Sequence, residues 1–563
     1  MSRIFTELQL PASSYQTISK PSSSDLEILL TDLPKEAQRP SSKANDSFQQ
    51  SLGGEPSENT TGPTQISTLK ASVIIATAAS MTLMSSLLTG ILTVGLPVMA
   101  KNIGLKENLL LWPASVHGLA CGCTLLLSGS VGDVIGNRSL YLAGCGLLSA
   151  FTLGCGLAQT GIQLIIFRAI SGVAMSLSLP SSVSIITTTF QAGQRRNIAF
   201  ASLGASQPVG FSLGIVLGGV LIAGIGWRYG YYIVAALNVC ILLVAIWQIP
   251  KDPRVAAGTI TWTRLYYGVD WMGTALVSLS LGIFSYTLST MTVSINELTK
   301  PANLALLILS LIFLVAFIFW IFRQEKLGRV AMIPPSLFKA DASSAPCRAR
   351  NFTTVCISVF LTWAVFNAFQ YFTSLYFQRI QNLSALQASA RFIPMVVAGA
   401  LTNIATGLLV QRVKANVLCV FAAIISGIAP LLMALTKPNW SYWTVPFIAV
   451  GLIPVSADTL FTVSNLVITS TFPAKMHGLA GGVFNTISQI GMSVGLAVAA
   501  VVANAVTGSL ADGGESTRDE KVVQAVLKGY RAAYWMSFAA GAVIVGLSWW
   551  GLRSIGKIGL KMD

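Results

Sequence analysis

The chain has 563 residues, of which 53% are hydrophobic and only 10% are charged, and its formal net charge is +15. Soluble proteins average about 25% charged residues, so this composition excludes a protein whose whole surface faces water. The excess Lys and Arg residues lie in short stretches between apolar runs, which favours a membrane-topology signal over nucleic-acid binding. The apolar runs are about 20 residues long and do not alternate strictly, so we expect membrane-spanning helices rather than a barrel.

The first segment, residues 1–70, is rich in Ser, Pro, Thr and Glu and contains no apolar run long enough to span a bilayer. This composition predicts a disordered cytoplasmic tail. The segment also lacks the short apolar core and cleavage site of a signal peptide. An unstructured tether and a phosphorylated regulatory tail are the two alternatives for its role.

About fourteen apolar runs follow, each near the length needed to cross the hydrocarbon core. The expected spans are residues 71–98, 108–128, 139–158, 162–188, 198–224, 230–249, 270–291, 302–322, 352–377, 386–410, 416–435, 443–470, 478–504 and 530–552. The expected domains after the tail are a six-helix bundle at 71–250, two accessory helices and a central cytoplasmic loop at 251–350, a second six-helix bundle at 351–553, and a cytoplasmic tail at 554–563.

The orientation in the membrane follows from the loops, because most cations fall on one side if the spans alternate. These cations are Arg138, Arg195, Arg196, Lys251, Arg254, Arg264, Arg323, Lys326, Arg329, Lys339, Arg348, Arg350, Arg412, Lys414, Lys475, Lys557 and Lys561. Both termini are therefore expected to be cytoplasmic. The acceptor sequences at Asn382 and Asn439 would then face outward as candidate N-glycosylation sites, close to the membrane.

The most distinctive polar stretch, Gly129–Arg138, separates the second and third expected spans and reads GSVGDVIGNR. Gly129 and Gly136 permit close helix approach and tight backbone geometry, and Asp133 can bond to backbone N–H groups or pair with Arg138. The stretch resembles the G-x-L-x-D-R-x-G-R-[RK] loop of the major facilitator superfamily, a family of secondary transporters. The resemblance implies a cytoplasmic latch that forms in one conformation and breaks in the other, and a solvated turn is the alternative.

A weaker copy of this loop, Gly407–Lys414, lies at the cytoplasmic end of the tenth span and contributes Arg412 to the expected latch. Gln411 stands there in place of the acid, and Ile135 stands in the first copy where the family has Arg or Lys. Internal repeats are expected in transporter folds, so spans 1–6 and 9–14 form two equivalent halves. The resemblance implies the major facilitator fold: an all-α polytopic membrane protein with two six-helix bundles and two accessory helices.

Two further segments narrow the resemblance. Val269–Gly273 (VDWMG) is similar to the D-W-x-G at the start of the seventh span of fourteen-span drug:proton antiporters. Gly226–Ile233 (GWRYGYYI) is similar to the W-R-W-x-F segment that opens their sixth helix. The chain resembles most the fungal members related to aminotriazole-resistance and low-affinity ammonium transporters, over nearly everything after residue 70.

The fifth span carries glycines that repeat every four residues and form a smooth face for close helix packing. The expected packing residues are Pro208, Gly210, Gly214, Gly218 and Gly219. Pro208 should bend the helix. The segment resembles the antiporter motif G-P-x-L-G-G, which is associated with export, although Ile215 replaces its Pro. We expect this span to pack the two halves together.

Three titratable residues inside spans are candidates for proton coupling. Asp458 is the only acid deep inside a span, where ionisation is costly, and a membrane acid near neutrality can carry a proton. Arg168 lies in the fourth span, in a segment that resembles the family's R-x-x-Q-G motif, with snorkelling to the interface as the alternative. His117 also titrates near neutrality, although a lone His is more often structural.

Polar and aromatic residues in the ninth span share one helical stripe, which predicts a lining for an interior cavity. Residues of the twelfth and thirteenth spans extend this set, and interhelical hydrogen bonding is the alternative role for each. The expected cavity residues are Trp363, Asn367, Gln370, Tyr371, Asn465, Asn485 and Gln489. An aromatic and polar cavity suits an amphiphilic or aromatic substrate.

These observations predict a proton-coupled secondary transporter, not an enzyme, that exports small organic toxins or secondary metabolites. The alternatives are transport of a small inorganic or nitrogenous solute such as borate or ammonium, and a transporter-like receptor. No ATP-binding P-loop, zinc-hydrolase or serine-hydrolase motif is present, and no metal or cofactor is expected. Protons, a small molecule and lipid are the expected partners of a monomer in the plasma membrane or, alternatively, the vacuolar membrane.

Overall fold

The computed structural model describes residues 67–106, 109–190, 194–250, 265–266, 268–291, 300–338, 347–410, 412–471, 477–511 and 518–553. The chain divides into two units, Met1–Ile66 and Ser67–Asp563, and all the described residues belong to the second. The tail expected at 1–70 lies outside the described residues except for its last four, and residues 68–70 already begin the first helix. The expected C-terminal tail, 554–563, also lies outside them.

The described residues contain fourteen helical segments long and apolar enough to cross a membrane, as the apolar runs predict. Helices satisfy every backbone group internally, which lipid requires. The helices are α3 (Thr68–Asn102), α4 (Trp112–Ile135), α5 (Asn137–Leu157), α6 (Gly161–Thr189), α7 (Gln194–Gly224), α8 (Trp227–Gln248), α11 (Trp271–Met291), α12 (Pro301–Lys326), α13 (Cys347–Leu375), α14 (Ala385–Ala390), α15 (Ile393–Leu409), α16 (Ala415–Leu435), α17 (Pro446–Leu452), α18 (Pro454–Thr471), α19 (His477–Ala511) and α20 (Arg518–Gly551).

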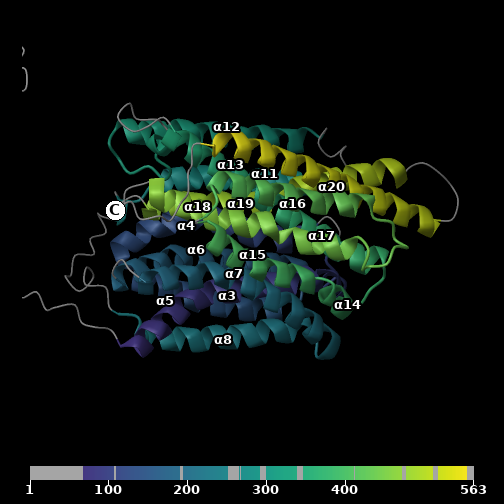
Figure 1. Cartoon of the computed structure of the whole chain (residues 1–563), viewed down its shortest axis with the longest axis horizontal. Helices are drawn as coiled ribbons and strands as arrows, with labels where there is room; N and C mark the ends of the chain where they lie inside the picture. The colour runs from purple at the N-terminus through teal and green to yellow at the C-terminus, as the bar shows by residue number, and fades with distance from the viewer. Residues whose placement is uncertain are drawn as a thin grey trace, which may run out of the picture. The chain divides into compact units, whose positions relative to one another are not determined.

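Helices α3–α8 pack on one another and form the first bundle (Figure 1). Within it α3 packs along α7, α6 contacts both α4 and α5, and α5 also contacts α8. Small residues permit these close contacts. A Cβ atom on Gly144 of α5 would lie only 2.9 Å from the carbonyl oxygen of Ala174 on α6. Such small residues are a common means of packing helices in a membrane, where van der Waals contact drives their association.

Helices α13–α20 form the second bundle, in which α13 contacts α19 and α20, and α16 contacts α18 and α20. Two of its spans are composite: α14 is followed by α15, and α17 by α18. Pro394 stands in the first turn of α15, and Pro454 begins α18. Proline lacks a backbone N–H and therefore fits the first turn of a helix. The short helices α14 and α17 lie at the same end of this bundle (Figure 1).

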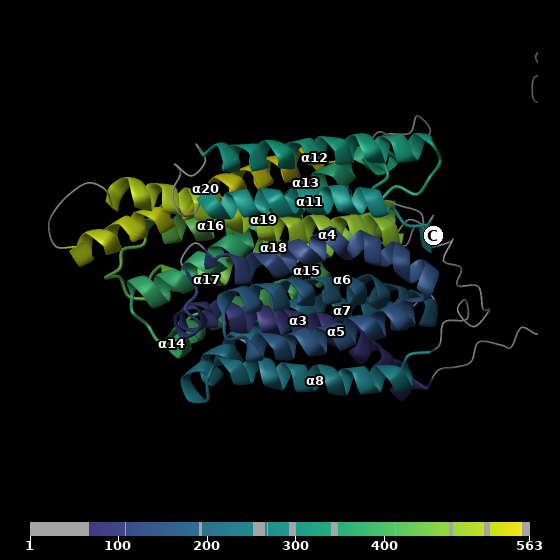
Figure 2. The same ribbon diagram turned by 180° about the vertical axis from the view of Figure 1, so that it is seen from behind.

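The accessory helices α11 and α12 pair with each other, and α11 also contacts α4 and α19, as Figure 2 shows. Asp270 holds this pair in place. Its Oδ1 atom accepts hydrogen bonds from Gly273 N at 2.8 Å and from Trp320 Nε1 at 2.9 Å. Its Oδ2 atom accepts one from Met332 N at 3.0 Å. The carboxyl group therefore caps the start of α11 and ties it to α12 and the turn that follows.

The two bundles meet where α4 packs against α19 and where α7 packs against α14 and α15. Gly122 faces α19 closely, since a Cβ there would lie 3.0 Å from Ile490 Cγ1. Val94 and Ile215 of the first bundle belong to the same buried apolar cluster as Phe369 of the second. The expected fold, all-α with two six-helix bundles and two accessory helices, is confirmed.

Candidate functional site

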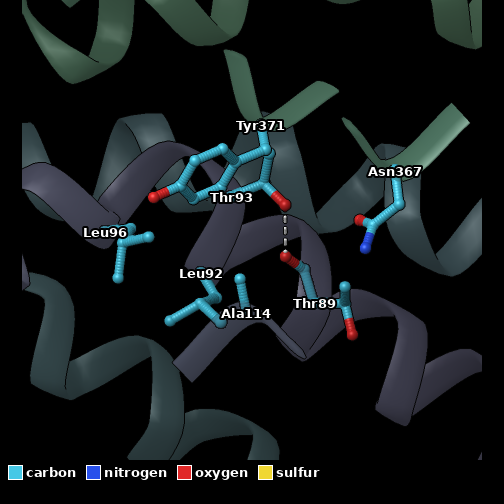
Figure 3. A pocket seen from close by; sticks show the side chains of 7 residues that line it. All are labelled: Thr89, Leu92, Thr93, Leu96, Ala114, Asn367 and Tyr371. Carbon is cyan, nitrogen blue, oxygen red and sulfur yellow. Dashed lines mark hydrogen bonds between the residues drawn. The ribbon is translucent and has the colours of Figure 1, made fainter. Parts of the chain in front are cut away.

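A small pocket lies between the two bundles and is called the central pocket below (Figure 3). It has about 10 Å³ of free space, close to the least volume that holds one water molecule. Helices α3 and α4 of the first bundle and α13 of the second supply its walls. The lining residues are Thr89, Leu92, Thr93, Leu96, Ala114, Asn367 and Tyr371.

The polar groups of the central pocket are mostly arranged as acceptors. The Thr89 hydroxyl donates to Ser85 O at 3.0 Å, and the Thr93 hydroxyl donates to Thr89 O at 2.8 Å. The Asn367 amide N–H donates to Met492 O at 2.9 Å. The two hydroxyl protons and one of the two Asn367 amide N–H groups are thus used within each bundle, so hydroxyl lone pairs and the Asn367 amide oxygen remain to accept hydrogen bonds. No lining residue is charged.

The predicted stripe on α13 is divided between two surroundings. Asn367 and Tyr371 line the central pocket, as expected for cavity residues. Trp363 instead makes edge-on ring contacts, with centroid distances of 5.6 Å to Phe366 and 6.4 Å to Phe461. Gln370 is buried and donates to a methionine sulfur of its own bundle at 3.7 Å. The stripe therefore contributes two of its four predicted residues to the pocket.

The other predicted cavity residues do not line the central pocket. Asn485 donates to Gly481 O of its own helix at 2.9 Å. Gln489 faces α4 across the bundle interface, where its carbonyl oxygen would lie 3.3 Å from a Cβ on Gly118. Asn465 lies on α18, but its side chain is outside the described residues.

A buried polar cluster in the first bundle brings His117 and Arg168 together. Arg168 is only 1% exposed, and its Nε donates to Pro113 O at 3.3 Å. Its two terminal nitrogens have no hydrogen-bond partner among the described residues. Arg168 is thus a buried cation rather than a snorkelling one, and it lies close enough to His117 to interact electrostatically. A buried cation of this kind is costly and is expected to be functional.

The hydrogen bonds of His117 define its tautomer. Its Nε2 lies 3.1 Å from Ser85 Oγ, and its Nδ1 lies 3.3 Å from Ser171 Oγ. Ser171 Oγ already donates to Arg168 O at 2.8 Å, so the ring must donate to it through Nδ1–H. Nε2 is then left as the acceptor for the Ser85 hydroxyl. Gly172 permits this contact, because a Cβ there would overlap the His117 backbone.

Asp458 lies in the second bundle, on α18, and faces α15. Its Oδ2 would be 3.0 Å from a Cβ on Gly399, and the Asn403 side chain is its hydrogen-bonding partner. Asn403 also donates to Gly399 O at 3.1 Å. Asp458 and Arg168 thus belong to separate clusters in different bundles, and no ion pair joins them within the described part of the chain.

The structure places the glycines and the arginines of the loop expected to act as a latch. Gly136 has a φ of 102° between α4 and α5, a conformation that favours glycine. Arg138 extends to α8 and donates to Ile246 O at 2.6 Å. Asp133 and Arg412 are both exposed. Gly129 lies near α6, since a Cβ on it would be 3.9 Å from Pro180. A latch that involves Asp133 stays a prediction.

The glycine repeat of α7 packs within the first bundle, whereas α7 as a whole also contacts α14 and α15 of the second bundle, as expected of a span that packs the two halves together. A Cβ on Gly210, Gly214 or Gly218 would overlap the backbone of α3. Gly219 alone among the four faces the second bundle, where a Cβ would lie 2.6 Å from Ser389 Cβ of α14. Pro208 lies inside α7.

Sequence reasoning missed several residues that the structure places at these sites. Thr89 and Thr93 belong to a series of Ser and Thr residues in the first span, and their spacing of one turn is the weak signal that could have identified them. Asn403 is the polar partner of Asp458, and an Asn inside a span could have been paired with the acid. The candidate glycosylation residues Asn382 and Asn439 are both exposed, the former with a φ of 52°.

Comparisons with known proteins agree with this architecture. The family model "Major Facilitator Superfamily" matches residues 78–496. An "MFS-type transporter 1" of Pyricularia oryzae is 42% identical over 534 residues, which cover 88% of this chain and 85% of that protein. A "Low affinity ammonium transporter" of Saccharomyces cerevisiae is 25% identical and covers 76% of this chain and 77% of its own. An "Efflux pump terJ" of Aspergillus terreus is 24% identical, over 80% of this chain and 82% of that protein.

Among solved structures, the fold is similar to a bacterial homologue of the human lysosomal transporter Spinster in an inward-facing and occupied conformation. The TM-score is 0.59 at 14% identity, and the match covers 87% of this chain and 98% of that one. The chain is thus a multi-pass membrane protein and a transporter by family rather than an enzyme, and it belongs to the major facilitator superfamily.

Proposed function

We propose that the protein is a proton-coupled secondary transporter that exports small organic compounds bearing hydrogen-bond donors. The central pocket carries this proposal. Both bundles line it, so its shape changes whenever one bundle rocks against the other. Its hydroxyl and amide oxygens suit N–H and O–H groups, while Leu92, Leu96 and Ala114 suit an apolar body. The relative named as an efflux pump and the small-residue face of α7 favour export.

The proton would be carried by Asp458, with the Arg168–His117 cluster acting in the other bundle. Asp458 is an acid among helices with an Asn as its partner, so it can hold a proton without an adjacent cation. The terminal nitrogens of Arg168 are buried without a hydrogen-bond partner among the described residues, so they would bind an anion or dipole that the rocking motion admits. Because Asp458 and the Arg168–His117 cluster lie in different bundles, proton binding at Asp458 and the rocking of the bundles can influence each other although the two sites do not touch.

A second candidate is transport of a small nitrogenous solute, with ammonium as the example. Ammonium offers only hydrogen-bond donors, and the central pocket offers mostly acceptors in a volume near that of one water molecule. The relative named as a low affinity ammonium transporter favours the same solute. The two candidates differ in the size of the solute that the open pocket must accept.

Flux into liposomes separates these proposals. The purified full-length protein would be tested under an imposed pH gradient with amphiphilic amines and alcohols, their fully methylated analogues, and methylammonium. We expect the donor-bearing organic compounds to move and the methylated analogues to move at least about tenfold more slowly, as for loss of one buried hydrogen bond. Equal flux of both series would contradict the proposed recognition, and flux of methylammonium alone would favour the second candidate.

We further propose cytoplasmic termini, a monomer, and the plasma membrane as the site of action, with the vacuolar membrane as the alternative. The loop charges and the exposed positions of Asn382 and Asn439 support this orientation. A glycosidase-induced mobility shift of the expressed protein, lost in the double variant Asn382→Gln/Asn439→Gln, would test it.

A further inference from the structure

A proline in α3 leaves one backbone carbonyl without its usual partner. Helix α3 contains Pro97 in its last two turns. In an α-helix the carbonyl of residue i accepts a hydrogen bond from the N–H of residue i+4. Proline has no N–H, so the carbonyl oxygen of Thr93 cannot be bonded in this way by its own helix. A buried carbonyl without a partner is costly, and a partner must come from elsewhere.

The second bundle supplies that partner. Ser374 of α13 donates its hydroxyl to Thr93 O at 2.7 Å. Gln378, one turn further along, donates its amide to Val94 O at 2.9 Å and to Ser374 Oγ at 3.1 Å. The two side chains therefore face the same stretch of α3 and cross from one bundle to the other. Gln378 lies in the π-helical turn Tyr376–Ile380 that ends the span, and such turns are frequent at functional sites.

These hydrogen bonds are shielded from water. Ser374 is 1% exposed, and Val94 is fully buried in the apolar cluster that both bundles share. Hydrogen bonds in such surroundings are costly to break unless the freed groups find water or new partners. The contact is therefore a discrete one, either made or replaced by water, and suits a two-state motion.

The contact lies directly beside the central pocket. Thr93 contributes its side chain to the pocket and its carbonyl oxygen to Ser374. Tyr371, which also lines the pocket, precedes Ser374 by three residues and so lies on the same face of α13. Separation of Ser374 from Thr93 would move α13 away from α3 and open the pocket towards the C-terminal end of α3.

We propose that Pro97, Ser374 and Gln378 form a gate that closes the central pocket on the side of the C-terminal end of α3, the outer side in the expected orientation. The gate is held by the carbonyl that Pro97 frees. Substitution of Pro97 by Ala would restore an N–H that competes for Thr93 O within α3. Ser374 would then have a weaker acceptor, although no side chain of the contact has changed. This inference goes beyond the proposed function, because it depends on neither the substrate nor the proton.

The test measures access to the pocket instead of transport. A full-length variant without native cysteines carries one reporter, Thr89→Cys. Right-side-out and inside-out vesicles are treated with a membrane-impermeant maleimide, and the rate of modification is followed. We expect Ser374→Ala, Gln378→Leu and Pro97→Ala each to raise the rate at least about fivefold in right-side-out vesicles, with little or no rise in inside-out vesicles.

Matched controls change the same residue types elsewhere. Pro180→Ala removes a proline from inside α6, and Ser537→Ala removes a buried hydroxyl that donates to its own helix at 2.9 Å. Both should label at the reporter's original rate. Unchanged labelling in Pro97→Ala would overturn the role of the proline, and unchanged labelling in all three gate variants would overturn the gate. If Ser374→Ala fails to fold, Gln378→Leu and Pro97→Ala decide together, since Pro97→Ala keeps both donor side chains, and unchanged labelling in both would overturn the gate. Failure of the proposed transport function would leave these labelling rates unaffected.

Discussion

Asn367 on α13 donates its amide N–H to the carbonyl oxygen of Met492 on α19, at 2.9 Å, and thereby fixes the amide group at the edge of the central pocket. The bond commits one of the two amide N–H groups to its own bundle. The amide oxygen is left as an acceptor beside Thr89 and Thr93, whose hydroxyl protons are also committed. These acceptors suit groups that donate hydrogen bonds, which the proposed function requires.

Replacement of Asn367 by Leu should weaken substrate binding. Loss of one buried hydrogen bond costs about 1–3 kcal/mol, so KM should rise about five- to a hundredfold with a smaller effect on the maximal flux. Initial rates of uptake into liposomes over a range of substrate concentrations would measure this. Asn485→Leu removes an amide that bonds to its own helix and should change KM by less. Equal effects of the two variants would contradict the placement of the pocket.

Replacement of Gly214 by Ala should destabilise the first bundle. The added Cβ would overlap the backbone of Leu87 on α3, and overpacking costs about 1–3 kcal/mol. Gly224→Ala, at the end of the same helix, meets no atom within 4 Å and serves as the control. Thermal unfolding of the purified protein in detergent should show a lower Tm for the first variant only. A similar Tm for both would mean that α3 and α7 are not as close as the structure places them.

Replacement of Asp270 by Ala should loosen the accessory helices while the two bundles remain folded. Three donors would lose their acceptor, from Gly273, Trp320 and Met332. Loss of a helix cap and its hydrogen bonds costs about 1–3 kcal/mol. Proteolysis between α12 and α13 should become faster, while Ser336→Ala, on the exposed turn that follows, should leave the rate as it is. Unaltered proteolysis of the Asp270 variant would show that the accessory pair is held by packing alone.

The sequence predicts the membrane-spanning helices and their grouping into two bundles and an accessory pair well. Length and apolarity alone decide which segments cross lipid. It predicts the contents of the site less well. A glycine repeat such as Gly210, Gly214 and Gly218 defines a smooth face, but the helix that meets this face depends on the arrangement of the whole bundle. The partner is α3, not the second bundle.

The same limit applies to the pocket. Asn367 and Tyr371 of the polar stripe of α13 line the pocket, whereas Trp363 and Gln370 turn towards their own bundle. The polar stripe covers a wider part of the α13 surface than the part that faces the small central pocket. Thr89 escaped prediction because a Thr hydroxyl can bond to its own helix, so the hydroxyl residues of the first span do not by themselves show which of them line a pocket.

We propose that Asp458 carries the proton that drives transport, and the pH-driven flux of the variant Asp458→Asn is the sharpest test of this role. Asn is close in size and keeps hydrogen bonding to Asn403, but it cannot take up or release a proton. The measurement compares flux in liposomes with and without a pH gradient, at equal amounts of inserted protein. We expect the variant to lose the pH-driven component of flux while exchange of substrate without a gradient persists. Undiminished pH-driven flux in Asp458→Asn would contradict it.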